Sequence, residues 1–297
     1  MPERIRISHS VSNTVNTCSR KLLFERKHRI FTEYGSIAMR YGSAFHKGME
    51  FYYRNKKSLV AGWEAAAKYW KKPTVQKFNE DYRNLQSLLN SISIYHDQYQ
   101  ADEEEVFGEP ENKLSVIISL TDEEKRCYGD IEVEFVVIID LMLVVSGMKW
   151  VVDFKTTSVD LPYMAAKLQK MIQLMGYQFV AREHYEGVNG TMVYYHQLKA
   201  TKSRKTGEYG AIKTNFMKFP QIYSNRDYAD WRRHVIWNAF KLKKAAEADY
   251  PPDFGHCFDF NSTCGFMPLC THPRWDIERF KTTDGFVIVP DERETGE

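Results

Sequence analysis

Residues 136–155 read VVIIDLMLVVSGMKWVVDFK, and this stretch decides the fold. Its two apolar, β-branched runs are separated by a Ser-Gly turn signal, so they predict neighbouring β-strands in antiparallel pairing. Asp140 follows the apolar residues 136–139, and Asp153 follows Val151 and Val152 after the turn. Antiparallel pairing can bring both carboxylates to one end of a sheet. Lys155 then projects from the same face as Asp153, because side chains alternate along a strand.

Two carboxylates beside an ammonium group suit a divalent-metal site. Mg²⁺ prefers oxygen ligands, so Asp140, Asp153 and the backbone carbonyl of Phe154 could hold Mg²⁺ or Mn²⁺. Such an ion lowers the pKa of bound water and neutralises charge on a phosphodiester. Lys155 would orient or deprotonate that water, or stabilise the charge that develops on phosphorus. The alternative is that each aspartate merely caps a strand and faces solvent.

The composition allows a folded protein and leaves the substrate open. Of 297 residues, 43% are hydrophobic, which is enough for a buried core. The net charge of +2 neither requires nor excludes nucleic acid. No apolar run approaches the roughly 18 residues that span a bilayer, and the N-terminus lacks an apolar signal core. We therefore expect a cytoplasmic protein without a membrane partner, in the host cytoplasm if the gene belongs to a phage.

The pattern of apolar residues predicts an α+β fold, with a mixed central β-sheet flanked by helices. We expect a helical N-terminal part at 1–105, a core sheet at 106–220, and a C-terminal helix with a Cys-rich tail at 221–297, all in one compact unit. The expected helices lie at 8–24, 42–53, 60–70, 75–100, 161–185 and 226–248. The expected strands lie at 114–120, 131–145, 149–155, 190–199 and 212–219.

Polar pairs at helical spacing flank the predicted strands. His46 and Glu50 lie four residues apart on one helix face, and Gln173 and Tyr177 do so on another. His46 could be a further metal ligand or a phosphate contact. Gln173 and Tyr177 could reach DNA phosphate or position the lysine. The plainer alternatives are a surface His–Glu pair and an amphipathic helix whose tyrosine lies in the core.

These motifs form an ordered series along the chain: Gly-x-x-x-His at 42–46, Asp140, Asp-x-Lys at 153–155 and Gln-x-x-x-Tyr at 173–177. The series resembles the PD-(D/E)XK nuclease superfamily, specifically its RecB-like branch with the Cas4 nucleases, over roughly residues 8–275. The resemblance implies a restriction-endonuclease-like core. It also implies that His46, Asp140 and Asp153 bind metal and that Lys155 is catalytic. Gln173 and Tyr177 match the glutamine and tyrosine of the family motif.

Four of the five cysteines form a second pattern. An odd number in a chain expected to be cytosolic argues against a disulfide framework. One early and three late cysteines suit a [4Fe–4S] cluster that ties the two ends of the chain together: Cys18, Cys257, Cys264 and Cys270. Nucleases of the Cas4 and AddB type, which this series resembles, carry such a cluster. A Cys₄ zinc site and free buried thiols are the alternatives, and Cys127 is expected to be structural.

Together these patterns predict a metal-dependent deoxyribonuclease, a hydrolase of phosphodiesters stabilised by the cluster. We expect an exonuclease that acts on single-stranded DNA or DNA ends in recombination, repair or Cas4-like processing. Basic clusters after Cys18 and at 202–205 would contact phosphates. No Walker motif is present, so a helicase or recombination protein would be a separate partner. The alternatives are a catalytically silent DNA-end-binding or assembly subunit of a larger nuclease complex, and a zinc-stabilised nucleic-acid binder.

Overall fold

The computed structural model describes residues 2–79, 81–258, 263–271 and 285–289. Its largest sheet is five-stranded and mixed, with the order β3-β6-β7-β8-β9. Only the central pair, β7 and β8, is parallel. These strands are β3 (Glu104–Val106), β6 (Leu141–Val145), β7 (Met148–Thr157), β8 (Val188–Lys199) and β9 (Lys213–Gln221).

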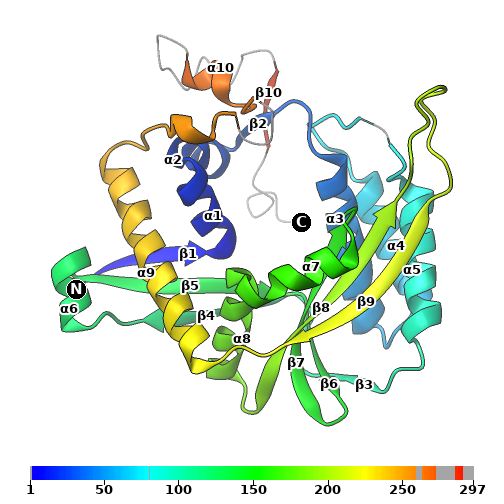
Figure 1. The fold of residues 1–297 in the computed structure, drawn as a ribbon, viewed down its shortest axis with the longest axis horizontal. Helices are drawn as coiled ribbons and strands as arrows, with labels where there is room; N and C mark the ends of the chain where they lie inside the picture. Colours follow the sequence, from blue (N-terminus) through cyan, green and yellow to red (C-terminus); the bar gives the residue numbers. More distant parts are fainter. Residues whose placement is uncertain (1, 80, 259–262, 272–284, 290–297) are drawn as a thin grey trace.

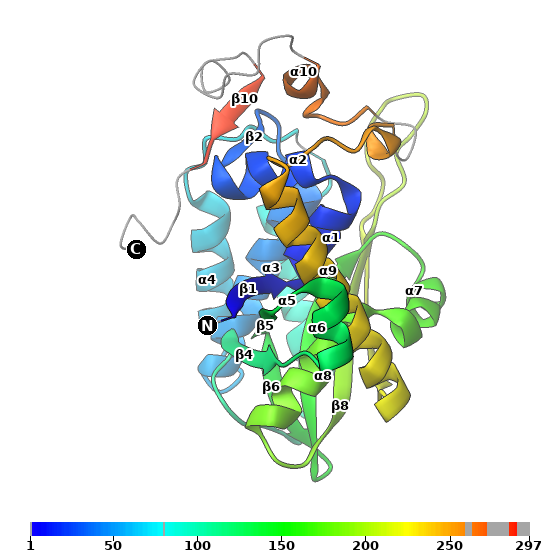
Figure 2. The same cartoon turned by 90° about the vertical axis from the view of Figure 1, so that its left-hand side faces the viewer.

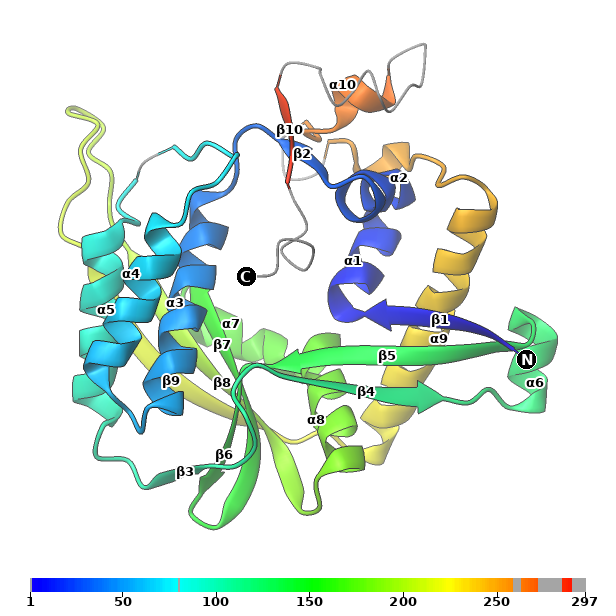
Figure 3. The ribbon, with the colours of Figure 1, turned by 180° about the vertical axis from the view of Figure 1, so that it is seen from behind.

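A three-stranded sheet lies beside it, with the order β1-β5-β4. Its strands are β1 (Glu3–Ser8), β5 (Ile131–Ile139) and β4 (Asn112–Ile118), and β1 runs parallel to β5. The chain passes from β5 directly into β6 through Asp140, so this residue stands where the two sheets meet. Figure 3 shows β5 running from the three-stranded sheet toward β6 and β7, with β4 antiparallel beside it.

Helices cover both faces of the five-stranded sheet (Figure 1). On one face lie α3 (Ile37–Arg54), α4 (Leu59–Lys71) and α5 (Leu85–Tyr99), whose apolar residues pack against Trp150, Val152 and Phe154 of β7. On the other face, α8 (Ile172–His184) packs against Val151 of β7 and against the three-stranded sheet. Odd-numbered residues of β7 therefore point toward α8, and this periodicity places Asp153 and Lys155 on that face.

The two ends of the chain lie side by side. Helix α9 (Asn225–Glu247) runs along α1 (His9–Thr17) (Figure 2), and Asn16 of α1 donates to Asn238 of α9 at 2.8 Å. Farther along, the short α10 (Met267–Cys270) follows Phe266, whose ring stacks on Phe24 with 5.3 Å between centroids. Strand β10 (Phe286–Ile288) pairs with β2 (Ile30–Thr32). The C-terminal tail thus packs on the N-terminal segment.

The α+β fold is as predicted, and the differences lie in the boundaries of elements. The expected strand at 131–145 is two strands in two sheets. The expected helix at 75–100 begins only at Leu85, because Asn84 and Ser87 form a capping box. The expected helix at 8–24 is interrupted at Cys18, whose backbone is extended. The structure adds α6 (Asp122–Tyr128) and the strands β1, β2, β3 and β10, which were not expected from the sequence.

The other expected helices differ in extent: α3 begins at Ile37 instead of residue 42, and the expected helix at 161–185 is divided in two. Residues 161–185 hold α7 (Leu161–Lys167), a 3₁₀ turn at Leu168–Lys170, and α8. The segment after Cys18 holds α2 (Ser19–Leu22) and a π-helical turn at Leu23–Lys27, and a 3₁₀ turn occupies Phe254–His256. None of the helices in the described part of the chain is long and apolar enough to cross a membrane.

Candidate active site

The strand register brings the two predicted aspartates together. Leu141 of β6 pairs with Val152 of β7, so the preceding residue, Asp140, lies opposite Asp153. The Phe154 backbone N–H donates to Asp140 Oδ2 at 2.8 Å. This bond fixes the carboxylate of Asp140 against β7, and the antiparallel pairing of β6 with β7 is the one expected from the sequence.

Asp153 is the most buried charged group of the site, with 1% of the residue exposed. Lys155 Nζ donates to its Oδ1 at 2.8 Å, while its Oδ2 is buried without a hydrogen-bond partner. Burial raises the pKa of Asp153, and the attraction of Lys155 offsets this only in part. Burial opposes the charge on Lys155 as well, but the carboxylates of Asp153 and Asp140 outweigh it and raise the pKa of the lysine. Lys155 is therefore an ammonium ion at neutral pH.

His46 enters the site from α3. Its Nδ1 lies 3.2 Å from Asp140 Oδ2. Burial would lower the pKa of His46, but the charge and hydrogen bond of Asp140, together with the charge of Asp153, outweigh burial and raise it. Helix α3 approaches β7 closely at Gly42, where a Cβ atom would lie 3.0 Å from Thr156 Oγ1. Glu50, four residues after His46, is not part of this group, because its carboxylate is paired with the flanking cations Lys47 (2.6 Å) and Arg54 (3.1 Å).

Glu111 is a member of the site that the sequence reading missed. Ligand atoms of His46, Glu111 and Asp140 all lie within 4.8 Å of one another. Burial, and then the charge of Asp140, raise the pKa of Glu111 to about 7. The segment 102–111 holds five other acidic residues, and nothing local to the sequence singles out this one. Only the pairing of β4 with β5 brings it to Asp140.

Gln173 and Tyr177 lie next to each other on α8, as predicted from their spacing. Gln173 Nε2 donates to the Tyr177 hydroxyl oxygen at 2.8 Å. Burial, and then the charges of Asp153 and Asp140, raise the pKa of Tyr177 well above its usual value. The phenol thus stays protonated, close enough to Asp153 and Asp140 to be affected by their charges.

The donor set fits a divalent cation. Carboxylate oxygens are the ligands that Mg²⁺ prefers, and an imidazole nitrogen also suits Mn²⁺ and other transition metals. The unpartnered Oδ2 of the buried Asp153 is a further acceptor that a cation would satisfy. A buried acceptor without a partner is costly, so it points to a ligand at this place.

The four cysteines singled out in the sequence gather at the junction of the two chain ends. Cys18 Sγ accepts a hydrogen bond from the Asp253 backbone N–H at 3.5 Å, and the Cys264 N–H donates to the Cys257 carbonyl at 2.7 Å. Burial raises the pKa of Cys270 to about 11, and the nearby thiols of Cys18, Cys264 and Cys257 add to it. Cys127 lies apart from them, exposed on α6.

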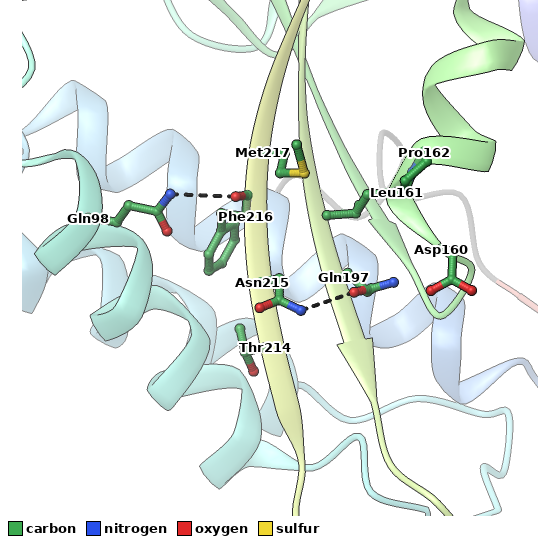
Figure 4. A pocket seen from close by; sticks show the side chains of 9 residues that line it. All are labelled: Gln98, Asp160, Leu161, Pro162, Gln197, Thr214, Asn215, Phe216 and Met217. Atoms are coloured by element: carbon green, nitrogen blue, oxygen red, sulfur yellow. Dashed lines mark hydrogen bonds between the residues drawn. The ribbon is translucent and has the colours of Figure 1, made fainter.

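A cavity of about 420 Å³ opens at a different place, beside β9 (Figure 4). Amide side chains contribute much of its polar lining, and Asn215 donates to Gln197 at 3.1 Å across it. None of the acidic-site residues lines this cavity. The acidic site is therefore defined by its charged groups and lies apart from this cavity.

Carboxylates on paired strands beside a lysine define a class of metal-dependent phosphodiester hydrolase. A family model agrees, since residues 6–271 match the one described as "PD-(D/E)XK nuclease superfamily". The chain belongs to this superfamily, whose members are phosphodiesterases that use divalent metals and typically act on DNA.

Two solved structures are similar to this chain at low sequence identity. A protein from Eubacterium rectale, described as a "Putative exonuclease", is 13% identical with a TM-score of 0.47. The protein SSO0001 is 12% identical with a TM-score of 0.36. Each comparison covers 91% of this chain and 88% of the other. The search among curated proteins finds no match.

Proposed function

We propose that this protein is a metal-dependent DNA exonuclease of the RecB-like branch. It acts on DNA ends in recombination, repair or Cas4-like processing, and a [4Fe–4S] cluster stabilises it. One observation carries the proposal: Asp140 and Asp153 face each other on paired strands, with Lys155 Nζ 2.8 Å from Asp153. The restriction to DNA ends rests on the likeness of the ordered motifs to that branch.

The metal would be held by Asp140, Asp153, His46 and the backbone carbonyl of Phe154. A divalent ion bound there lowers the pKa of its water and neutralises charge on the scissile phosphate. Lys155 lies next to these ligands, where it would orient the attacking water or stabilise the charge that develops on phosphorus.

Tyr177 adds a second donor on the same side of the sheet. Its phenol stays protonated, because burial and the carboxylates raise its pKa. Gln173 holds the phenol in place through the 2.8 Å hydrogen bond. These two residues would orient a DNA phosphate toward Lys155.

The cysteine group fits a cluster better than a single zinc ion. Tetrahedral zinc with Zn–S bonds of about 2.3 Å needs sulfur atoms about 3.8 Å apart. Among the described residues, no three cysteine sulfurs lie within 4.8 Å of one another, although Cys270 is close enough to the other three to feel their charge. A [4Fe–4S] cluster is held by cysteine sulfurs that lie farther apart than those around one zinc ion. It would bind the C-terminal tail to the segment after α1.

The test is cleavage of end-labelled single- and double-stranded DNA by anaerobically purified protein with Mg²⁺ or Mn²⁺. The Asp153→Asn variant should lose at least about a thousandfold in rate, because several kcal/mol of charge stabilisation depend on the metal. Asp160→Asn is the matched control, since its side chain is 78% exposed and pairs with Lys199 at the surface, away from the acidic site. A product ladder from labelled ends would give the polarity. Folded, cluster-loaded wild type without activity on any end would favour a silent DNA-binding subunit.

A further inference from the structure

His9 is a half-buried histidine at the start of α1, directly after β1. Strand β1 runs parallel to β5, and its last residue, Ser8, pairs with Val136, which precedes Asp140 by four residues. Figure 3 shows α1 beginning beside β5 at the end of β1. His9 is thus attached to the strand that leads to the acidic site.

The His9 side chain points to the side of the sheets on which α8 lies. Along β1, Ile5 and Ile7 are buried in the core that includes residues of α8, and Ser8 keeps an extended backbone. Side chains alternate along an extended segment, so His9 follows Ile5 and Ile7. Burial, and then the positive charge of Lys155 on the same side, lower the pKa of His9 to about 4. The ring is therefore neutral at neutral pH.

One ring nitrogen of His9 has a partner and the other does not. Nε2 lies 2.9 Å from Nδ2 of Asn13, which is one turn farther along α1. An amide nitrogen can only donate, so Nε2 accepts, and the neutral ring carries its hydrogen on Nδ1. Nδ1 is buried and has no hydrogen-bond partner among the described residues. A buried donor without an acceptor is costly, so it marks a place for a hydrogen-bonding ligand.

The surroundings of this donor favour an anion. In this tautomer the Nδ1–H group of His9 has no lone pair to offer a metal ion. Lys155 is the charged group that shifts the pKa of the ring most. Arg26 donates to Ser10 Oγ at 3.0 Å, which places a second cation beside the first turn of α1. A phosphate oxygen accepts hydrogen bonds and is attracted by both cations, so a DNA phosphate fits this place.

We propose that His9 binds the DNA substrate by donating a hydrogen bond from Nδ1 to a phosphate oxygen beside Lys155. Asn13 is a positioning residue, because it fixes the tautomer that leaves Nδ1 as the donor. This inference rests on the proposed function, since it adds a contact for the substrate to the same site. The contact involves no metal ion, so it contributes to the binding of DNA before any cleavage.

Binding of single-stranded DNA in EDTA tests the contact, measured by fluorescence anisotropy of an end-labelled oligonucleotide. We expect His9→Leu to raise Kd about tenfold, because a hydrogen bond to a charged group is lost. His9→Asn has nearly the same size as His9→Leu but keeps an amide donor near the place of Nδ1, so it should restore most of the affinity. His184→Leu is the matched control and should bind like the wild type. His184 is exposed and lies about three turns from Gln173 along α8.

The salt dependence of Kd separates this contact from a general effect on the fold. A neutral donor releases no counterions, so His9→Leu should leave the slope of log Kd against log salt unchanged. Lys155→Met should reduce that slope by about 0.7. An unchanged Kd in His9→Leu would overturn the inference. So would a His9→Asn variant that binds as weakly as His9→Leu while its circular dichroism spectrum is native.

The outcomes also separate this inference from the proposed function. Cleavage by the wild type, together with an unchanged Kd in His9→Leu, would overturn the His9 contact and leave the nuclease proposal standing. Binding that depends on His9, in a wild type that cleaves no DNA, would support the contact and overturn the nuclease proposal. A wild type that neither binds nor cleaves DNA would overturn both.

Discussion

The Asp140 carboxylate accepts a hydrogen bond from the Phe154 backbone N–H at 2.8 Å. Asp140 lies between β5 and β6, and Phe154 lies in the middle of β7. The bond therefore holds the junction of the two sheets in the orientation that presents both aspartates. The same side chain thus has a structural partner in addition to the metal-binding role that we propose for it.

These two roles of Asp140 can be separated by substitution. Asp140→Asn keeps an oxygen acceptor for the Phe154 N–H, whereas Asp140→Ala leaves that buried donor unpaired. We expect Asp140→Ala to lower the free energy of unfolding by about 2 kcal/mol more than Asp140→Asn does. Both variants should lose DNA cleavage, since neither carries the charged ligand. Urea denaturation measures the first effect, and equal stability of the two variants would contradict it.

Lys155 should contribute to catalysis more than to metal binding. Lys155→Met removes a donor next to the reacting phosphate, and removal of one such group typically costs about a hundredfold or more in rate. The measurement compares the cleavage rate with the affinity for Mn²⁺, which should be retained or raised because a competing cation is gone. Lys199→Met is the control, since Lys199 pairs with Asp160 at the surface. Unchanged cleavage by Lys155→Met would remove this lysine from the mechanism.

Serine substitution should affect bound iron and thermal stability at the clustered cysteines but not at Cys127. Cys264→Ser and Cys270→Ser should lose bound iron and lower Tm by at least about 5 °C, because binding of a cluster contributes directly to folding. Cys127→Ser should change neither, since this cysteine is exposed on α6. Iron and zinc analysis of anaerobically purified protein, together with thermal melts, provides the measurement. Zinc in place of iron would show that the cysteines form a zinc site. Protein without either metal would show that the cysteines are free thiols.

His196 should make the fold sensitive to acid. The residue is fully buried, its ring stacks on Phe216, and neither ring nitrogen has a hydrogen-bond partner. Burial lowers its pKa to about 3, against about 6.5 in the unfolded chain. Between these values the unfolded state binds the extra proton, so stability falls as the pH falls, by up to about 1.4 kcal/mol per pH unit.

Substitution of His196 checks this dependence. From pH 7.5 to pH 5, the wild type should lose about 2 kcal/mol of unfolding free energy through this residue. His196→Phe removes the titrating ring and should flatten the profile by that amount, whatever its effect on stability at neutral pH. Urea denaturation at the two pH values measures the difference. If the unfolding free energy of both proteins depended on pH in the same way, protonation of His196 would not destabilise the folded state.

A buried ion-pair network links β3 and β9, the two edge strands of the five-stranded sheet. The Glu104 side chain is fully buried, pairs with Lys218 at 2.5 Å and Lys57 at 3.3 Å, and accepts from the Tyr194 hydroxyl at 2.8 Å. Lys218→Met should destabilise the protein by about 3 kcal/mol, because it leaves a buried carboxylate short of its main counter-charge. Lys213→Met, an exposed change on the same strand, should have little effect. Similar unfolding midpoints for both variants would contradict this.

The sequence by itself determined the local geometry of the site. Alternation along residues 149–155 placed Asp153 and Lys155 on one face, and the turn before them implied the pairing that brings Asp140 opposite. The spacing of Gln173 and Tyr177 likewise predicted neighbours on a helix. These features follow from the periods of strand and helix, which are properties of the backbone and hold wherever the element lies.

Only the tertiary structure decided which distant groups meet. Glu111 reaches Asp140 through the register of β4 on β5, and β1 forms only because β5 offers it a parallel partner. The division into two sheets at Asp140 also lies outside what a continuous apolar run can reveal. Cross-strand register and sheet order depend on the packing of the whole chain, and no local pattern of residues encodes them.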